Sequence, residues 1–173
     1  YKYFDIGTAK LKLEEQRGVP HHLIDILDPD QDFSVAQFQS LARHKIREIQ
    51  ERGKLPFLVG GTGLYIQAVV YPFEFPDTKG YQVIRKDLRR MWGDGKQEEI
   101  YQKLKDIDPA SAERIDPHDF RRISRALEVY YLTGRLFSSY QQDNKKPLYR
   151  VEMVGITYQR PELYRRIEKR VDK

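Results

Sequence analysis

Two patterns of hydrophobic and polar positions follow one another in the first third of the chain. Across residues 34–53, apolar side chains recur every three or four positions, which predicts a helix with one buried face. Ser34 with Gln37 matches a capping box, and Gly53 stands where a helix-ending glycine is common. Residues 55–61 (LPFLVGG) are a nearly continuous apolar run, typical of a parallel strand covered on both faces. Helix, strand, glycine turn and helix in succession indicate an α/β fold.

From about residue 78 the pattern becomes helical only. The spacing predicts three helices, over residues 80–92, 97–105 and 116–133. The last has Asp116 at its N-cap position, Pro117 at its first position and Gly134 just past its end. Residues 149–161 return to strand composition, and Pro161 opens another helix.

The order of these elements predicts an α/β fold in which a parallel sheet is flanked by helices and interrupted by an all-helical insertion domain. The expected domains are residues 1–77 (first part of the core), 78–140 (insertion) and 141–173 (return to the core).

Composition excludes some classes of protein. A charged fraction of 33% and a mean hydropathy of −0.74 exclude an integral membrane protein, and we expect no membrane association. Cysteine is absent, so no disulfide framework or thiol chemistry is available. This composition fits a cytoplasmic protein. Adjacent His21 and His22 would point to opposite faces of a strand, so we expect no metal site on the protein.

The formal net charge of +5 is unevenly distributed. Residues 1–78 carry 9 Lys and Arg against 11 Asp and Glu, whereas residues 79–173 carry 22 against 15. A basic half is typical of a protein that meets a polyanion. A solvated basic surface has the same composition, so both interpretations stay open.

The turn Gly60-Gly61-Thr62-Gly63 is the first candidate for chemistry. Backbone amides at a glycine-rich turn that opens a helix can bind an anion, with the helix dipole assisting. The turn matches neither a Walker A loop nor the G-x-G-x-x-G pattern. The alternative is a tight turn that needs glycine only for its backbone angles.

Basic side chains supply further candidates. Arg121, Arg122 and Arg125 gather near the start of one predicted helix, where the dipole disfavours cations. Guanidinium groups so placed suggest an anionic partner such as phosphate, against the alternative of a solvated face. Arg85 lies in another helix of the basic half, and Arg170 in the last one. Lys10 could also pair with phosphate, against the alternative of an exposed lysine with no specific partner.

Five segments then occur in a distinctive order along essentially the whole chain. They read FDIGTAK, GVPHHLIDILDPDQDFSVAQFQ, LPFLVGGTGLY, IDPHDFRRISRALEVYYLTG and RIEKRVDK. Together they resemble bacterial tRNA dimethylallyltransferases, the tRNA isopentenyltransferases. The resemblance implies an α/β core of the nucleotide-binding P-loop NTPase type and a tRNA-binding helical insertion. The implied reaction transfers a dimethylallyl group from its diphosphate to N6 of adenosine 37, in tRNAs that read codons beginning with U, with Mg²⁺ on the diphosphate.

The resemblance also implies roles for single residues. In the insertion, the positions matching tRNA contacts near the anticodon stem-loop are Arg85, Arg121, Arg122, Ile123, Ser124 and Arg125. In the core, Gly60, Gly61 and Thr62 match residues that line the reaction channel, and Thr62 also matches a tRNA contact. Arg170 matches an arginine that is important for the diphosphate and for turnover. The resemblance thus implies Thr62 and Arg170 as the catalytic residues. Lys10 is assigned to the diphosphate side.

The same resemblance predicts that the chain is an internal part of a longer, monomeric protein. The phosphate-binding loop and the aspartate expected as general base would precede Tyr1, so we predict that the 173-residue chain alone has no transferase activity. Two other classes stay open: a non-catalytic module that binds an RNA stem-loop, and a P-loop nucleotide kinase. A binding module has no reason to recognise dimethylallyl diphosphate, and a kinase would show no dependence on tRNA.

Overall fold

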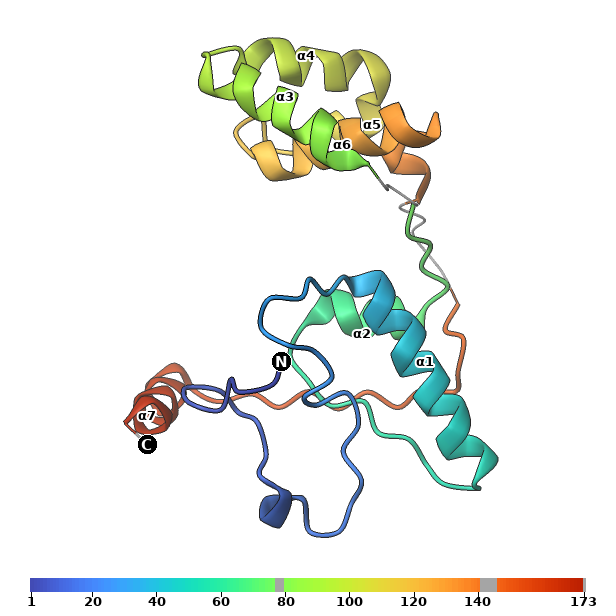
Figure 1. Cartoon of the computed structure of the whole chain (residues 1–173), viewed down its shortest axis with the longest axis vertical. Coiled ribbons are helices and arrows are strands. Elements are labelled where there is room, and N and C mark those ends of the chain that lie inside the picture. Colours follow the sequence, from blue (N-terminus) through green and yellow to red (C-terminus); the bar gives the residue numbers. More distant parts are fainter. Residues whose placement is uncertain (77–79, 141–145, 173) are drawn as a thin grey trace. The chain divides into compact units, whose positions relative to one another are not determined.

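The computed structural model describes residues 1–76, 80–140 and 146–172, which form two compact units (Figure 1). One unit combines Tyr1–Pro72 with Pro147–Lys173, and the other is Phe73–Lys146. The domain boundaries expected at 77/78 and 140/141 involve residues outside the described ranges. None of the described helices is both long and apolar enough to cross a membrane.

The first unit contains a helix pair and a separate C-terminal helix. Its helices are η1 (Leu13–Gln16), α1 (Val35–Glu51), α2 (Gly63–Val70) and α7 (Arg160–Val171). The capping box expected at the start of α1 is confirmed: the Ser34 hydroxyl accepts the Gln37 N–H at 3.2 Å, and the Gln37 side chain accepts the Ser34 N–H at 2.8 Å. After α1, Gly53 has a φ of +68°, a left-handed conformation that glycine adopts without strain.

α1 and α2 pack against each other and form the buried part of this unit. Phe38 of α1 stacks on Tyr65 of α2, with the ring centroids 4.4 Å apart. Ala68 and Val69 of α2 are completely buried, as is most of Ala42 on α1. Of the apolar positions that predict this helix, Phe38 covers α2, whereas Leu41 is 41% exposed.

The predicted parallel sheet is wrong, because the described residues contain no strand. The apolar run at 55–61 has no regular secondary structure, and Leu55, Phe57 and Val59 expose 75%, 81% and 89% of their surface. No backbone hydrogen bond joins this run, or residues 151–158, to another described segment. A sheet requires a ladder of bonds between strands, and an apolar run specifies only which side chains favour burial, not a neighbouring strand.

The second unit is a small helical bundle with its own core. Its helices are α3 (Tyr81–Gly93), α4 (Gln97–Ile107), α5 (Pro109–Ala112), α6 (Phe120–Thr133) and η2 (Phe137–Tyr140). Eight buried apolar side chains form the core: Leu88, Ile100, Leu104, Ala112, Ile115, Ile123, Ala126 and Leu127. α3, α4 and α6 contact one another around it. The helical character expected for this part of the chain is confirmed.

The helix predicted over 116–133 begins later than expected. Asp119, not Asp116, is its N-cap: an Asp119 carboxylate oxygen accepts the Arg122 N–H at 3.0 Å. Asp116 instead accepts the His118 N–H at 2.8 Å and stabilises the preceding turn. The end at Gly134 is confirmed, since this glycine has a φ of +69° and donates to the Tyr130 carbonyl.

Candidate functional site

A buried carboxylate holds two arginines together in the helical unit. Glu128 of α6 is completely buried, and it accepts hydrogen bonds from Arg85 of α3, at 2.6 Å from Nε and 2.8 Å from Nη2. Arg125 approaches the same carboxylate, with Nη1 3.7 Å from Oε2. The hydrogen bonds with Glu128 raise the pKa of the Arg85 guanidinium above its already high ordinary value. Arg85 also lies over the Tyr81 ring, 4.5 Å from its centroid.

The remaining residues of the predicted tRNA-contacting segment divide between surface and core. Arg121 and Arg122 are exposed in the first turn of α6, where Arg122 pairs with the N-cap Asp119 at 3.4 Å. Ile123 and Ser124 face inward and are buried. The side chains available to a ligand in this segment are therefore the arginines, and contacts by Ile123 and Ser124 stay a prediction.

The glycine-rich turn of the first unit is open to solvent. Gly60, Gly61 and Thr62 are exposed, and Thr62 is the N-cap residue of α2 without a capping bond from its hydroxyl. A Cβ added to Gly60 or Gly61 would meet no atom within 4 Å, and neither glycine has a positive φ. A left-handed backbone is therefore not what these two positions require.

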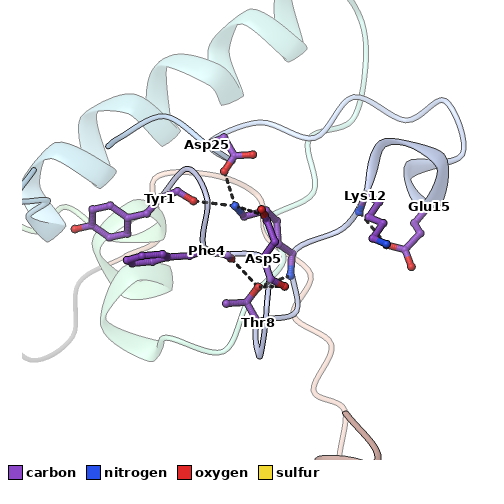
Figure 2. Close-up of polar contacts among 8 residues, drawn as sticks. Tyr1, Phe4, Asp5, Thr8, Lys12, Glu15 and Asp25 are labelled. Carbon is purple, nitrogen blue, oxygen red and sulfur yellow. Dashed lines mark hydrogen bonds and ion pairs between the residues drawn. The ribbon is translucent and has the colours of Figure 1, made fainter. Parts of the chain in front are cut away.

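Lys10, predicted on the diphosphate side, pairs with the carboxylates of Asp5 and Asp25, which are labelled in Figure 2. Its Nζ is 2.6 Å from Asp25 and 2.7 Å from Asp5, and it donates to the Tyr1 carbonyl at 2.9 Å. The hydrogen bond with Asp25, followed by the bond with Asp5, raises the pKa of the Lys10 amine above its usual range. In this arrangement the lysine charge is paired within residues 1–25.

Arg170, the remaining predicted site residue, is exposed near the end of α7. Within the described part of the chain no hydrogen bond or ion pair links Arg170 to Lys10 or Thr62. The structure thus joins Arg85 of α3 and Arg125 of α6 through Glu128, and it shows no such link among the predicted residues of the first unit that it describes. The described residues also contain no group of three or more potential metal ligands.

Sequence reasoning did not predict that Glu128 is buried and pairs with Arg85. The available signal was an acidic residue three positions after Arg125, on a helix whose neighbouring positions are apolar. An acidic side chain at such a position is rarely buried unless it is paired, so burial of Glu128 would imply a cationic partner. The partner Arg85 is 43 residues away, and only the packing of α3 against α6 identifies it.

Comparison with known proteins identifies the class of this chain. The family model described as IPP transferase matches residues 1–173, so the chain belongs to the IPP transferase family. It is 50% identical over 173 residues to the tRNA dimethylallyltransferase of Anoxybacillus flavithermus, covering 99% of this chain and 54% of that protein. It is 51% identical over 175 residues to the enzyme of the same name from Carboxydothermus hydrogenoformans, covering 56% of that protein.

Solved structures agree with this assignment. The full-length tRNA isopentenylpyrophosphate transferase from Bacillus halodurans is 47% identical and matches with a TM-score of 0.57, over 97% of this chain and 52% of that one. A eukaryotic dimethylallyltransferase acting on tRNA is 32% identical and matches with a TM-score of 0.59, over 75% of this chain and 32% of that one. The chain thus spans about half the length of the curated relatives it matches.

Proposed function

We propose that this chain is part of an enzyme that transfers a dimethylallyl group from dimethylallyl diphosphate to N6 of adenosine 37 in tRNAs reading codons that begin with U. The observation that carries the proposal is the identity of about one half to tRNA dimethylallyltransferases over 99% of the chain. The helical unit supports it physically, because its arginines offer planar donor forks suited to phosphate.

We assign the transfer reaction to residues of the first unit. In the reaction N6 bonds to the dimethylallyl carbon and loses a proton, while the bond from that carbon to the diphosphate oxygen breaks. Negative charge develops on the leaving diphosphate, which a positioned guanidinium such as Arg170 would stabilise. The exposed backbone at Gly60 and Gly61 and the Thr62 hydroxyl would face the reacting groups. Mg²⁺ would be bound by the diphosphate.

The proposal is tested by measuring RNA binding and prenyl transfer with the full-length protein. Anticodon stem-loops carrying adenosine 37 or guanosine 37 are compared at two salt concentrations. Strong preference for adenosine 37, with affinity that falls as salt rises and with transfer from dimethylallyl diphosphate, is expected. Equal binding of both RNAs without transfer would contradict the proposal and leave a basic RNA-binding module. Phosphorylation of a small substrate without tRNA would indicate a kinase instead.

Arg122 offers a sharply controlled variant for this assay. Its side chain is 71% exposed and pairs with Asp119, three positions earlier, at 3.4 Å. Arg90 is a matched control in the same unit: it is 72% exposed and pairs with Asp87, also three positions earlier, at 3.4 Å. We expect Arg122→Ala to weaken stem-loop binding about tenfold, as for a phosphate contact between charged groups, and Arg90→Ala to have little effect. Equal losses would indicate only an unspecific effect of net charge.

A further inference from the structure

The burial of Glu128 is not explained by stability alone. Removing a carboxylate from water is costly, and a buried ion pair often stabilises a fold no better than apolar side chains of the same volume. Here the carboxylate is completely buried, whereas its partners Arg85 and Arg125 keep 37% and 33% of their side-chain surface exposed. One buried negative charge therefore holds two positive charges that remain accessible from solvent.

The geometry aligns these groups along one side of α6. Arg121 and Arg125 are four residues apart, and Glu128 follows three residues later, so the three lie in a row on the helix. Arg85 joins the row from α3 through its two hydrogen bonds to Glu128, and the Tyr81 ring covers its guanidinium from another side. Arg85, Arg125 and Glu128 together carry a net charge of +1.

We propose that Glu128 is a positioning residue for RNA: it fixes the Arg85 and Arg125 guanidinium groups, in line with Arg121, to contact phosphates of the tRNA backbone. This inference rests on the proposed function and goes beyond it, because Glu128 itself never contacts the RNA. A long side chain that is already ordered loses less conformational freedom when it binds. The contacts of Glu128 with the two arginines therefore increase the affinity for RNA without adding a contact to the RNA.

The inference is tested with Glu128→Gln in the full-length protein, which keeps the side-chain shape and removes the charge. We expect the affinity for the adenosine 37 stem-loop to fall about tenfold, because two arginines must then be ordered on binding. The KM for tRNA should rise with kcat unchanged. The slope of log affinity against log salt should stay the same, because the cations that contact phosphate are retained. By contrast, Arg85→Ala should lower both the affinity and the slope.

Arg85→Lys keeps the experiment decisive if Glu128→Gln folds poorly. Lysine keeps the charge beside Glu128 but cannot make two parallel hydrogen bonds, so it should reproduce the loss of affinity at constant slope. Glu99→Gln is the control, since it removes one negative charge from an exposed pair with Lys103 in the same unit. In an Arg85→Ala background, Glu128→Gln should lower the RNA affinity less than it does in the wild-type protein, because only its effect on Arg125 remains.

Two results would overturn the inference while leaving the proposed function intact. If Glu128→Gln bound RNA more tightly and with a steeper salt slope, Glu128 would merely screen the arginines. If it lowered the urea midpoint but left the affinity of the folded protein unchanged, its role would be structural. A wild-type protein that failed to prefer adenosine 37 would overturn the proposed function and this inference together.

Discussion

At the scale of single residues, the helical unit contains a second buried carboxylate, that of Asp108. Asp108 is only 2% exposed and joins the α4–α5 junction to η2. Its carboxylate accepts the Ser111 N–H at 3.1 Å, the Ser111 hydroxyl at 2.7 Å and the Ser138 N–H at 2.8 Å. Burial alone raises the pKa of Asp108, but the hydrogen bonds from Ser138 and Ser111 outweigh burial and leave the pKa below its usual range.

We predict that Asp108→Asn lowers the free energy of unfolding by about 1.5–3 kcal/mol, the usual contribution of hydrogen bonds to a charged group. Asparagine has one acceptor oxygen, so its amide would face one of the two backbone N–H donors. Urea unfolding followed by circular dichroism measures the loss. Asp106→Asn is the control, because Asp106 is exposed and accepts one hydrogen bond, from Gln102. Equal effects of the two substitutions would contradict a special role for Asp108.

The difference in stability between wild type and Asp108→Asn should also depend on pH. The pKa of Asp108 is lower in the folded than in the unfolded state, so the charge stabilises the fold above the unfolded pKa of about 3.9 and this stabilisation is lost as pH falls through the folded pKa. The difference should be constant between about pH 5 and 7 and shrink below about pH 3.9. Urea unfolding at pH 7, 5 and 3 tests this. A gap that widened in acid would contradict the expected sign.

At the scale of elements, α1 stabilises the end of α2 by a contact that the hydrophobic pattern does not reveal. The last carbonyls of a helix lack partners within it, and cations are favoured there. The Arg43 guanidinium of α1 donates to two of these carbonyls, those of Ala68 and Val69, and to the carbonyl of the C-cap residue Tyr71, at 2.6–3.2 Å. An arginine on α1 thus completes the hydrogen bonding of α2.

We predict that Arg43→Met accelerates hydrogen exchange of the α2 amides by about tenfold, because the loss of these bonds makes local opening about 1.4 kcal/mol easier. Mass spectrometry of a peptide covering residues 63–72 measures the rate. Arg47→Met, one turn further along α1 at an exposed position, removes the same charge and should leave the rate unchanged. Similar acceleration by both variants would indicate a general effect on α1.

At the scale of the whole molecule, the two units differ in how completely they bury their apolar residues. The eight-residue core of the second unit comes entirely from the continuous segment Phe73–Lys146. In the first unit, α7 has no buried residue, and Ile6, Val59 and Val154 are at least 89% exposed. Burial of apolar surface is the main favourable term in folding, so we expect the second unit to be stable by itself.

We predict that residues 73–146, expressed alone, fold into a helical domain that unfolds cooperatively in urea. Leu127→Ala, at a completely buried position, should lower its stability by about 2–5 kcal/mol. Circular dichroism and a single urea transition test the prediction. Val83→Ala, at a position 70% exposed on α3, is the control and should change little. A helical content that declined gradually with urea would show that this segment depends on the rest of the protein.

The sequence by itself determined the helices and their ends where the signal is local. The capping box at Ser34 and the glycines at 53 and 134 act on residues within one turn, so the sequence predicts them correctly. The start of α6 was misplaced by three residues because two aspartates, at 116 and 119, both suit an N-cap, and only the folded chain shows which one caps it. The ordered motifs also identified the family without any structure.

Tertiary structure alone decided what depends on residues far apart in the chain. The apolar run at 55–61 favours a strand, but a strand exists only where a second segment completes its hydrogen bonds, and none does so in the described residues. The same holds at the candidate site, where the sequence identified the arginines but not the buried Glu128 that joins Arg85 to Arg125. Hydrogen bonds and ion pairs across a core depend on packing, which a pattern along one chain does not contain.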